Sequence, residues 1–352
     1  MLHGASRLRP ARLRVSWRAL QIGSAVLSTL LLGGCGQAAQ TSSNSPTLPP
    51  WVKQDPSLNP PGRWAASMAG DVSDQNVVLF GGNGGQSIFG DTWTWSAGTW
   101  TQQHPVSSPS PRKYASMTYD LSTNDVVLFG GAGPIGPALN DTWTWDGVTW
   151  TEQHPLTSPP ARERASMAFD SLTGSVLLFG GLGNGVTLDD TWEWNGTSWR
   201  EITPQTHPTA RVDSSLACPT TKAECVLFGG SAAPAKGQPA KDLNDTWSWN
   251  GQTWTQDHPA ATPPALEHPS IGYDPNSGTT LLFGGLSLTG SLGPTNATWS
   301  WNGKTWSLLR PSTSPPGRES ASMTFDPTTG HELLFGGENA YQSKTLNDRW
   351  SY

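Results

Sequence analysis

The chain has 352 residues and a formal net charge of −6; only 14 % of its residues are charged, whereas Gly (39), Pro (30) and Trp (19) are abundant. Such a composition favours many short strands joined by turns over helices. The acidic balance argues against nucleic acid and against an anionic membrane surface as binding partners.

Residues 1–34 are predicted to be a targeting segment. A basic stretch without acids precedes the apolar run Ala19–Leu32, which is too short to span a bilayer comfortably. The run ends in Leu-Gly-Gly-Cys, which resembles the lipobox of bacterial lipoproteins and implies a lipid on Cys35. The alternative is an ordinary signal peptide with a chance cysteine. Removing residues 1–34 takes away five arginines and lowers the formal charge from −6 to −11. The arginines are Arg7, Arg9, Arg12, Arg14 and Arg18.

Residues 35–50 are small, polar and rich in Pro, which predicts a flexible tether between a lipid anchor and a folded domain. We therefore expect an exported protein held at the cell membrane or cell surface by its lipid alone.

Residues 51–352 repeat one pattern at a spacing of 49 to 55 residues. Each period has an apolar strand, a Gly-Gly pair, a variable segment and a Trp-rich hairpin. A period near 50 residues with four short strands per repeat is typical of a β-propeller. The Gly-Gly pairs stand at 81–82, 130–131, 180–181, 229–230, 284–285 and 336–337.

The third period illustrates the four predicted strands. Strand A covers 165–170, strand B covers 176–179 and ends at Gly180-Gly181, strand C covers 190–194, and strand D begins near Thr197 after an Asn-Gly turn. Strand B is apolar without alternation in most periods, as expected for a strand covered on both faces. We expect the Trp side chains to form the core between blades, each indole N–H bonded to a carbonyl; the alternative is a sugar-stacking platform.

At this point the chain resembles the kelch family. The marks are the double Gly after an apolar strand and two aromatic residues separated by six others. The family usually has Tyr at the first aromatic position, where this chain has Trp. The resemblance implies an all-β, six-bladed kelch-type β-propeller; it implies little about function, because kelch propellers include binding modules, actin-bundling proteins and a few enzymes. The pairs are Trp93/Trp100, Trp143/Trp150, Trp192/Trp199, Trp247/Trp254 and Trp299/Trp306.

The sixth period stops inside strand C, at Tyr352. Its missing strand D matches the N-terminal segment 51–56, which aligns with 150–155. We therefore expect the N-terminal strand to close the last blade, because an open ring would leave sheet edges unpaired.

Two charged positions recur through the repeats. An Arg precedes strand A and an Asp begins strand C, and both are lost together in the fifth period, where Leu266 and Ala297 replace them. This joint loss predicts Arg–Asp pairs within blades, acting as structural latches; the alternative is a ligand-binding ring of Arg. The arginines are Arg63, Arg112, Arg162, Arg211 and Arg318, and the aspartates are Asp91, Asp141, Asp190, Asp245 and Asp348.

Cys218 and Cys225 are predicted to face each other across the A–B hairpin of the fourth period and to form a disulfide, with Cα atoms roughly 4.4–6.8 Å apart. No His, Cys or carboxylate set has the spacing of a metal site. No catalytic motif stands out either, so we expect no metal, cofactor or catalytic residue.

The variable B–C segments at 231–244, 286–296 and 338–347 are predicted to hold the partner, because varied loops on a rigid scaffold commonly build binding surfaces. The alternative is loops that merely drift in length. We expect a monomeric binding module for an unknown protein or carbohydrate of the cell envelope. Two other hypotheses remain: a carbohydrate-active enzyme of the sugar-oxidase or sugar-isomerase type, and a purely structural envelope protein.

Overall fold

The computed structural model describes residues 49–352 except 222, 233–239, 288–292, 340–341 and 343. The chain divides into two units, Met1–Ser45 and Pro46–Tyr352, and every feature below belongs to the second. The predicted signal peptide, the lipidation site Cys35 and the tether as far as residue 48 lie outside the described residues.

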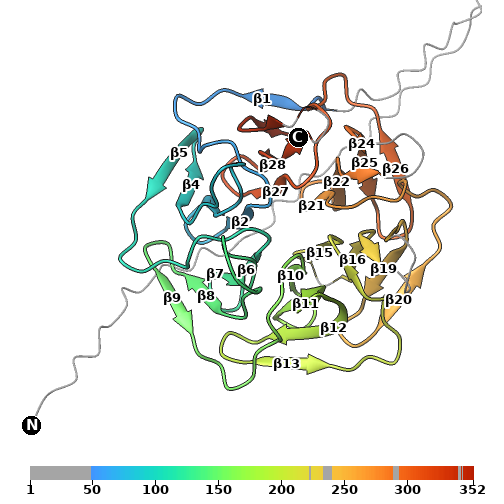
Figure 1. Cartoon of the computed structure of the whole chain (residues 1–352). Coiled ribbons are helices and arrows are strands. Elements are labelled where there is room, and N and C mark those ends of the chain that lie inside the picture. The colour runs from blue at the N-terminus through green and yellow to red at the C-terminus, as the bar shows by residue number, and fades with distance from the viewer. Residues whose placement is uncertain (1–48, 222, 233–239, 288–292, 340–341, 343) are drawn as a thin grey trace, which may run out of the picture. The chain divides into compact units, whose positions relative to one another are not determined.

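The described residues form six four-stranded antiparallel sheets. They stand as blades around a central channel (Figure 1), and we number them 1 to 6 from the blade containing β2 to the blade containing β27. The predicted all-β propeller is therefore confirmed. The sequence produces it because each blade has the apolar B strand and the Trp-rich C–D hairpin that neighbouring blades cover on both faces.

Each blade runs outwards from strand A to strand D. The A strands are β2 (Ser67–Asp71), β6 (Ser116–Asp120), β10 (Ser166–Asp170), β15 (Ser215–Ala217), β21 (Ser270–Asp274) and β27 (Ser322–Asp326). The B strands are β3 (Asn76–Phe80), β7 (Asp125–Phe129), β11 (Ser175–Gly183), β16 (Cys225–Phe228), β22 (Thr279–Phe283) and β28 (His331–Phe335). The C strands are β4 (Thr92–Ser96), β8 (Thr142–Trp145), β12 (Val186–Trp194), β19 (Thr246–Trp249), β25 (Thr298–Trp301) and β31 (Arg349–Ser351). The D strands are β5 (Thr99–Gln103), β9 (Trp150–Gln153), β13 (Trp199–Ile202), β20 (Trp254–Asp257), β26 (Trp306–Leu309) and β1 (Val52–Gln54).

The last blade is closed by the N-terminal strand, as predicted. Its strand order is β1-β31-β28-β27, and Val52 pairs with Ser351 while Gln54 pairs with Arg349. Both ends of the domain therefore contribute to one sheet, which leaves no blade with an unpaired outer C strand.

Blade 3 corrects one prediction. Gly180-Gly181 does not end strand B, because β11 continues to Gly183 and β12 begins at Val186. The register shifts between Phe179 and Gly181, where the two glycines have φ of +66° and +103°. A bulge at the glycines turns the strands without ending them, because the two-residue turn that follows keeps them paired.

The Trp side chains form the core between blades, but their N–H groups differ from the prediction. The D-strand Trp of blades 2 to 6 donates to a threonine hydroxyl of the preceding blade instead of a carbonyl, at 2.9–3.0 Å. Four of these threonines begin their C strands and Thr191 lies within β12, and sheet carbonyls are already engaged in the strand ladders, so the indole N–H uses a side-chain acceptor. The pairs are Trp150–Thr92, Trp199–Thr142, Trp254–Thr191, Trp306–Thr246 and Trp51–Thr298.

Six serines tie the A strands together around the channel. The hydroxyl of each donates to a backbone carbonyl of the next blade, and the last donates back to blade 1. These bonds close a circle, so the separation between blades is fixed at the channel wall. The serines are Ser67, Ser116, Ser166, Ser215, Ser270 and Ser322.

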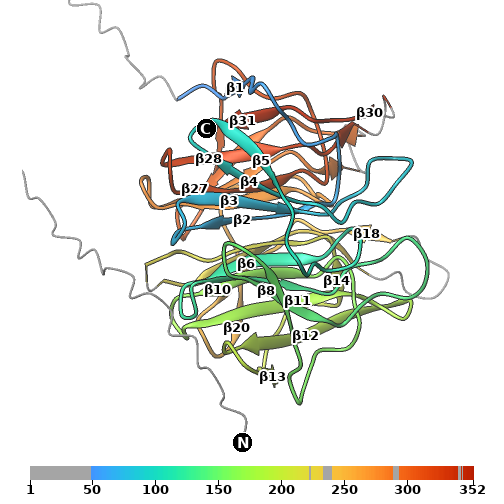
Figure 2. The same ribbon diagram turned by 90° about the vertical axis from the view of Figure 1, so that its left-hand side faces the viewer.

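The B–C segments lie on one face of the ring, which we call the B–C face. Figure 2 shows β14, β18 and β30 on one side and the C-terminus on the other. The short strands of this face are β14 (Arg211–Val212), β17 (Ser231–Ala232), β18 (Lys241–Asp242), β23 (Leu286–Ser287), β24 (Gly293–Pro294), β29 (Glu338–Asn339) and β30 (Lys344–Thr345).

Candidate functional site

The channel opens on the B–C face through a circle of six residues, one from each blade, which we call the mouth ring. The backbone N–H of each donates to the carbonyl of the ring residue in the preceding blade, at 2.9–3.2 Å. All six have a left-handed backbone, with φ between +51° and +61°, although none is Gly. The ring consists of Ala65, Tyr114, Arg164, Asp213, His268 and Ser320.

The predicted Arg and Asp residues meet in pairs, and each Arg lies two residues before the mouth-ring residue of its own blade. Each Arg places Nη1 2.6–2.7 Å from one carboxylate oxygen and donates from Nη2 to the other. The Arg side chains are 0–1 % exposed. This geometry is that of a structural latch, because no edge of the guanidinium remains for a ligand. The pairs are Arg63–Asp91, Arg112–Asp141, Arg162–Asp190, Arg211–Asp245 and Arg318–Asp348.

The latch also holds the Gly-Gly bend and the first C-strand Trp. In blade 1, Arg63 Nη1 donates to the Gly81 carbonyl at 2.8 Å, and Trp93 Nε1 donates to Asp91 Oδ2 at 2.7 Å. Burial alone would raise the pKa of Asp91, but the Arg63 guanidinium outweighs it and lowers that pKa below its usual value. The same causes lower the pKa values of Asp141, Asp245 and Asp348.

Blade 5 has no Arg–Asp pair at the latch position. Leu266 is buried at the Arg position, and Ala297 replaces the Asp. Trp299 Nε1, which would donate to that Asp, has no hydrogen-bond partner in the part of the chain that the structure describes.

The polar side chains of the mouth ring pair with one another. Arg164 Nη1 donates to Asp213 Oδ2 at 2.9 Å, and His268 Nε2 lies 2.7 Å from Asp213 Oδ1. The second contact is an ion pair without hydrogen-bond alignment, because neither ring nitrogen of His268 has an aligned partner among the described residues. Asp213 therefore lies between two cationic side chains from the neighbouring blades.

Tyr114 reaches across the mouth. Its ring stacks on that of His268, with centroids 5.6 Å apart, although their blades, 2 and 5, are three apart around the ring. The Arg164 guanidinium lies 4.3 Å from the centroid of the same ring, and Lys113 Nζ lies 5.4 Å from it. Three positively charged groups thus surround one aromatic ring, an arrangement favoured by its quadrupole.

His268 is a cation at neutral pH. Burial lowers its pKa, but the carboxylates of Asp213 and Glu319 outweigh burial and raise the pKa to about 9. A histidine held in this form donates hydrogen bonds and charge but does not accept a proton, so it is unsuited to act as a general base.

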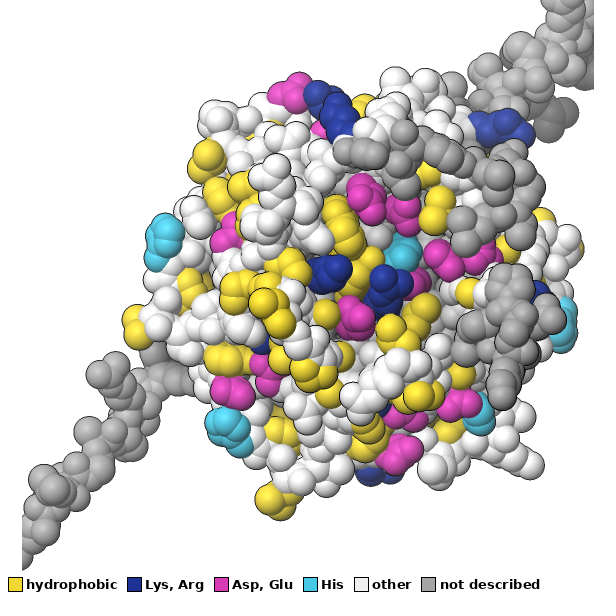
Figure 3. All heavy atoms as spheres, viewed as in Figure 1, with side chains coloured by type: hydrophobic (Ala, Val, Ile, Leu, Met, Phe, Trp, Pro, Cys, Tyr) yellow, Lys and Arg dark blue, Asp and Glu magenta, His cyan; other side chains and the backbone are white. Residues whose placement is uncertain are grey.

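Acidic residues surround the ring on the B–C face. Figure 3 shows acidic, basic and histidine side chains gathered at the centre of this face. Glu319 and Glu338 lie on paired backbone positions, and Glu319 Oε2 is 3.5 Å from His268 Nδ1. Burial, and then the neighbouring Glu319, raise the pKa of Glu338, while burial raises the pKa of Glu267. The residues that immediately precede the mouth-ring residues form the rim. They are acidic in blades 3, 5 and 6, where they are Glu163, Glu267 and Glu319, and basic in blade 2, where Lys113 occupies the position.

The mouth encloses a cavity of about 150 Å³. Its lining combines the polar ring residues with the small side chains Ala65, Ala66, Ser320 and Ala321. The opposite end of the channel holds a cavity of about 190 Å³ lined largely by Met, aromatic and other apolar side chains. The two ends differ in chemistry, and only the end on the B–C face presents charged groups.

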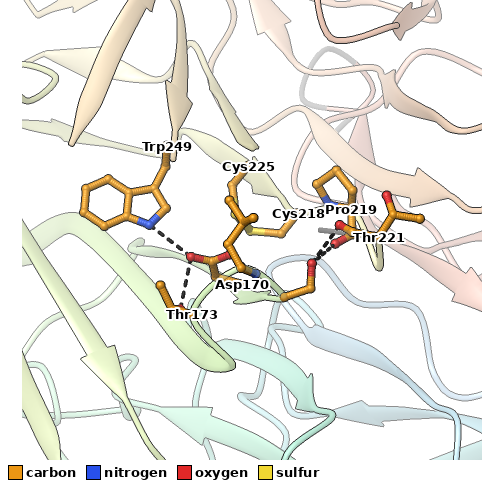
Figure 4. Close-up of a disulfide and its surroundings, with 9 residues drawn as sticks. Asp170, Thr173, Cys218, Pro219, Thr221, Cys225 and Trp249 are labelled. Atoms are coloured by element: carbon orange, nitrogen blue, oxygen red, sulfur yellow. Dashed lines mark hydrogen bonds between the residues drawn. A yellow bond between two sulfur atoms is a disulfide. The ribbon is translucent and has the colours of Figure 1, made fainter. Parts of the chain in front are cut away.

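The predicted disulfide joins Cys218 and Cys225 (Figure 4). Their Cα atoms are 4.1 Å apart, slightly less than the predicted range, because the two residues face each other directly across one hairpin. The A–B turns of the other five blades are held by an Asp that accepts a backbone N–H two residues later. Blade 4 has Pro219 at that position, so the disulfide lies where the turn lacks its Asp.

The B–C segments predicted from the sequence begin at the rim. Ser231, Leu286 and Glu338 pair with Val212, Glu267 and Glu319, respectively, each of which immediately precedes a mouth-ring residue. Residues 233–239, 288–292, 340–341 and 343 of these segments lie outside the described residues.

Sequence analysis missed the mouth ring and the serine circle. The signal was present in the short segment after each Arg, or after Leu266 in the fifth period. The serine repeats there in all six periods, while the residue two places after the Arg or Leu differs in every one. Alternation could not reveal it, because the mouth-ring residues lie in a connecting segment and each serine is only the first residue of its A strand.

Across residues 49–352, gaps excepted, no group of three His, Cys, Asp or Glu side chains could hold a metal ion. Within that range, no helix is long and apolar enough to cross a membrane.

Comparison with known proteins points to one family. A family model described as the KLHDC2/KLHL20/DRC7 Kelch-repeats domain matches residues 38–230. A search of curated proteins gave no match.

Proposed function

Because the chain belongs to the kelch-repeat family, we propose that it is a binding module that holds a protein partner over the channel mouth, on the B–C face. The observation that carries this proposal is the mouth ring. Its six equivalent backbone positions hold six different side chains, while the latch and the serine circle repeat almost unchanged around it. A repeated framework with one varied position per repeat is how a rigid scaffold presents a specific surface.

The backbone of the ring supports a functional role. A left-handed conformation costs a non-Gly residue on the order of 1–3 kcal/mol, and such residues cluster at binding and active sites. Tyr114, Arg164 and His268 are large side chains at φ of +51° to +61°. Glycine would relieve this strain but would remove the side chains that face the mouth.

The size of the cavity favours a protein partner. A volume of about 150 Å³, below the usual range for small-molecule pockets, suits contact with the rim better than engulfment of a ligand. A glycan is the second candidate, because Trp64 and Tyr114 form an edge-to-face aromatic pair at the rim, with centroids 5.5 Å apart.

Export and lipid anchoring at Cys35 are part of the same proposal. The chain enters β1 beside the C-terminal residues Ser351 and Tyr352, on the face opposite the mouth ring (Figure 2). The first strand of the domain therefore begins on the face opposite the proposed partner site.

Photo-crosslinking in cells tests the partner site. A photoreactive residue at Lys113, on the rim of blade 2, is expected to form an adduct of defined mass. The same residue at Val148, which is 76 % exposed in the C–D turn of the same blade, is the matched control. Arg164→Ser, which introduces the residue found at the equivalent position Ser320, should weaken the Lys113 adduct.

Adducts at Val148 and none at Lys113 would mean that the partner binds the opposite face. A Lys113 adduct whose mass falls to that of the protein alone after glycosidase treatment would indicate that the partner is a glycan.

A further inference from the structure

The cavity at the end of the channel opposite the mouth ring has a wall built in layers. Every blade contributes three consecutive residues to it, starting from the second residue of its A strand. The residues of the first layer are apolar, those of the second are small, and those of the third are mostly aromatic. We call this space the A–B chamber, because residues of the A–B turns line its opening. The layers are Met68, Met117, Met167, Leu216, Ile271 and Met323; Ala69, Thr118, Ala168, Ala217, Gly272 and Thr324; and Gly70, Tyr119, Phe169, Cys218, Tyr273 and Phe325.

Methionine is concentrated around this one space. Every methionine of the chain except Met1 lies in the first layer, and these four side chains are 7–9 % exposed. Leu216 and Ile271 occupy the same position in blades 4 and 5, so the fold does not require methionine there. A methionine side chain is unbranched and polarizable, and it adapts its shape to varied apolar ligands. The first layer is therefore a wall that can adjust to an apolar guest.

The chamber offers few hydrogen bonds to water. Among the described residues, no charged side chain lines it, and no lining side chain has a buried polar atom without a partner. Thr324 Oγ1 accepts the Gly70 backbone N–H at 3.1 Å, and the Tyr119 hydroxyl donates to Asn124 Oδ1 at 3.3 Å. Because an ordered buried water needs two to four polar partners, an apolar group suits this space better than water does.

The chamber is large enough for a ligand and extends along the axis of the ring. Its volume is about 190 Å³, whereas an apolar cavity of about 150 Å³ already binds benzene. The methionine layer also lines an adjoining cavity of about 180 Å³, which reaches the serine circle. Two cavities that follow each other along one axis suit a straight chain better than a ring.

The opening of the chamber indicates which end of a ligand enters. Val72 and Leu121 line it and are 46 % and 39 % exposed, so apolar surface leads inwards from solvent. An Asp ends the A strand of every blade except blade 4, and no Lys or Arg occurs in the turns that follow these aspartates. An anionic head group would therefore face negative charge at the opening. We propose that the A–B chamber binds one straight alkyl chain, the tail of an amphiphile whose head group is not anionic and stays at the A–B turns.

Calorimetric titration of the full chain with n-octanol tests this proposal. One octanol should bind per chain, and n-butanol and octanoate should each bind at least about tenfold more weakly. Thr118→Leu places a larger apolar side chain in the second layer and should weaken octanol binding by about tenfold or more. Thr151→Leu is the matched control, because it makes the same substitution at an exposed position in the outer strand of the same blade; it should bind octanol as the wild type does. Met117→Ala enlarges the chamber and should shift the preference towards n-decanol, which tests the site without adding bulk.

A brominated alcohol provides a direct readout in crystals of the full chain. After a soak with 8-bromooctanol, the bromine should give an anomalous peak beside the methionine layer, and this peak should vanish in Thr118→Leu. A chamber that holds only ordered water after the soak would overturn the proposal. So would octanol binding that is unchanged in a folded Thr118→Leu protein, or octanoate binding as tight as that of octanol.

Discussion

Glu332 should make the stability of the propeller fall as pH rises. It lies in strand β28 at a position where the other five blades have Val, Cys or Thr, and it is 1 % exposed. Neither carboxyl oxygen has a hydrogen-bond partner in the described residues. Gly272 leaves room for the group, since a Cβ there would clash with Glu332 Oε2.

The magnitude follows from the pKa of this carboxyl. Burial, and then the charge of Asp274, raise the pKa from 4.5 to about 8. The folded state therefore holds a proton that the unfolded state releases above pH 4.5, so stability is greatest below pH 4.5 and is lost as pH rises towards 8. At pH 7 the loss is roughly 3 kcal/mol, because each pKa unit corresponds to about 1.4 kcal/mol.

Glu332→Gln replaces the carboxyl group with an amide of nearly the same shape that does not ionise. Urea unfolding followed by Trp fluorescence should show Glu332→Gln more stable than the wild type at pH 7, with an advantage that grows by about 1.4 kcal/mol per pH unit between pH 5 and 8. Glu332→Val, the residue of three other blades, should be at least as stable at pH 7. A difference between Gln and Glu that does not change with pH would refute the argument.

Three further predictions concern the latch, the disulfide and the anchor. Arg162→Leu should destabilise blade 3 by about 3 kcal/mol in urea unfolding, because it leaves the partly buried Asp190 without its cation. Adding Asp190→Ala, as blade 5 has naturally, should recover part of the loss, and a double variant no better than the single would contradict the latch. Cys218→Ser should cost about 2–3 kcal/mol under oxidising conditions and nothing under reducing ones, as measured by thermal unfolding; equal melting of both proteins without reductant would mean that the bridge contributes no stability. Cys35→Ser should release the protein from membranes into the soluble exported fraction, and a variant that stays with membranes after a carbonate wash would rule out lipidation there.

The repeating features of the fold were predictable because every blade presents the same pattern. The Gly-Gly pair and the apolar strand before it mark each B strand, and the joint loss at Leu266 and Ala297 predicted the Arg–Asp pairs. The closure by β1 followed from the incomplete last period. Errors arose where one blade departs from the pattern: Gly180-Gly181 forms a bulge inside a hairpin instead of an end, since whether a glycine pair ends a strand depends on the length of the loop that follows.

The candidate site was less predictable because it is defined across blades. His268, Asp213 and Arg164 come from three repeats, and only the backbone circle brings them together. Their pairing depends on left-handed backbone at non-Gly residues, which residue type does not indicate. The recurring Arg, predicted as a latch with a ligand-binding ring as the alternative, lies in the right segment of each repeat, but the residue that faces the mouth is two places further along.

A variant of the mouth ring shows whether this ring holds the partner. Tyr114→Ala and Arg164→Ser together introduce the side chains that blades 1 and 6 carry at the same backbone position, so the latches and the serine circle are untouched. We expect this double variant to melt within a few degrees of the wild type and to lose the photo-adduct at Lys113. A double variant that is folded and still forms that adduct at the wild-type level would contradict the claim.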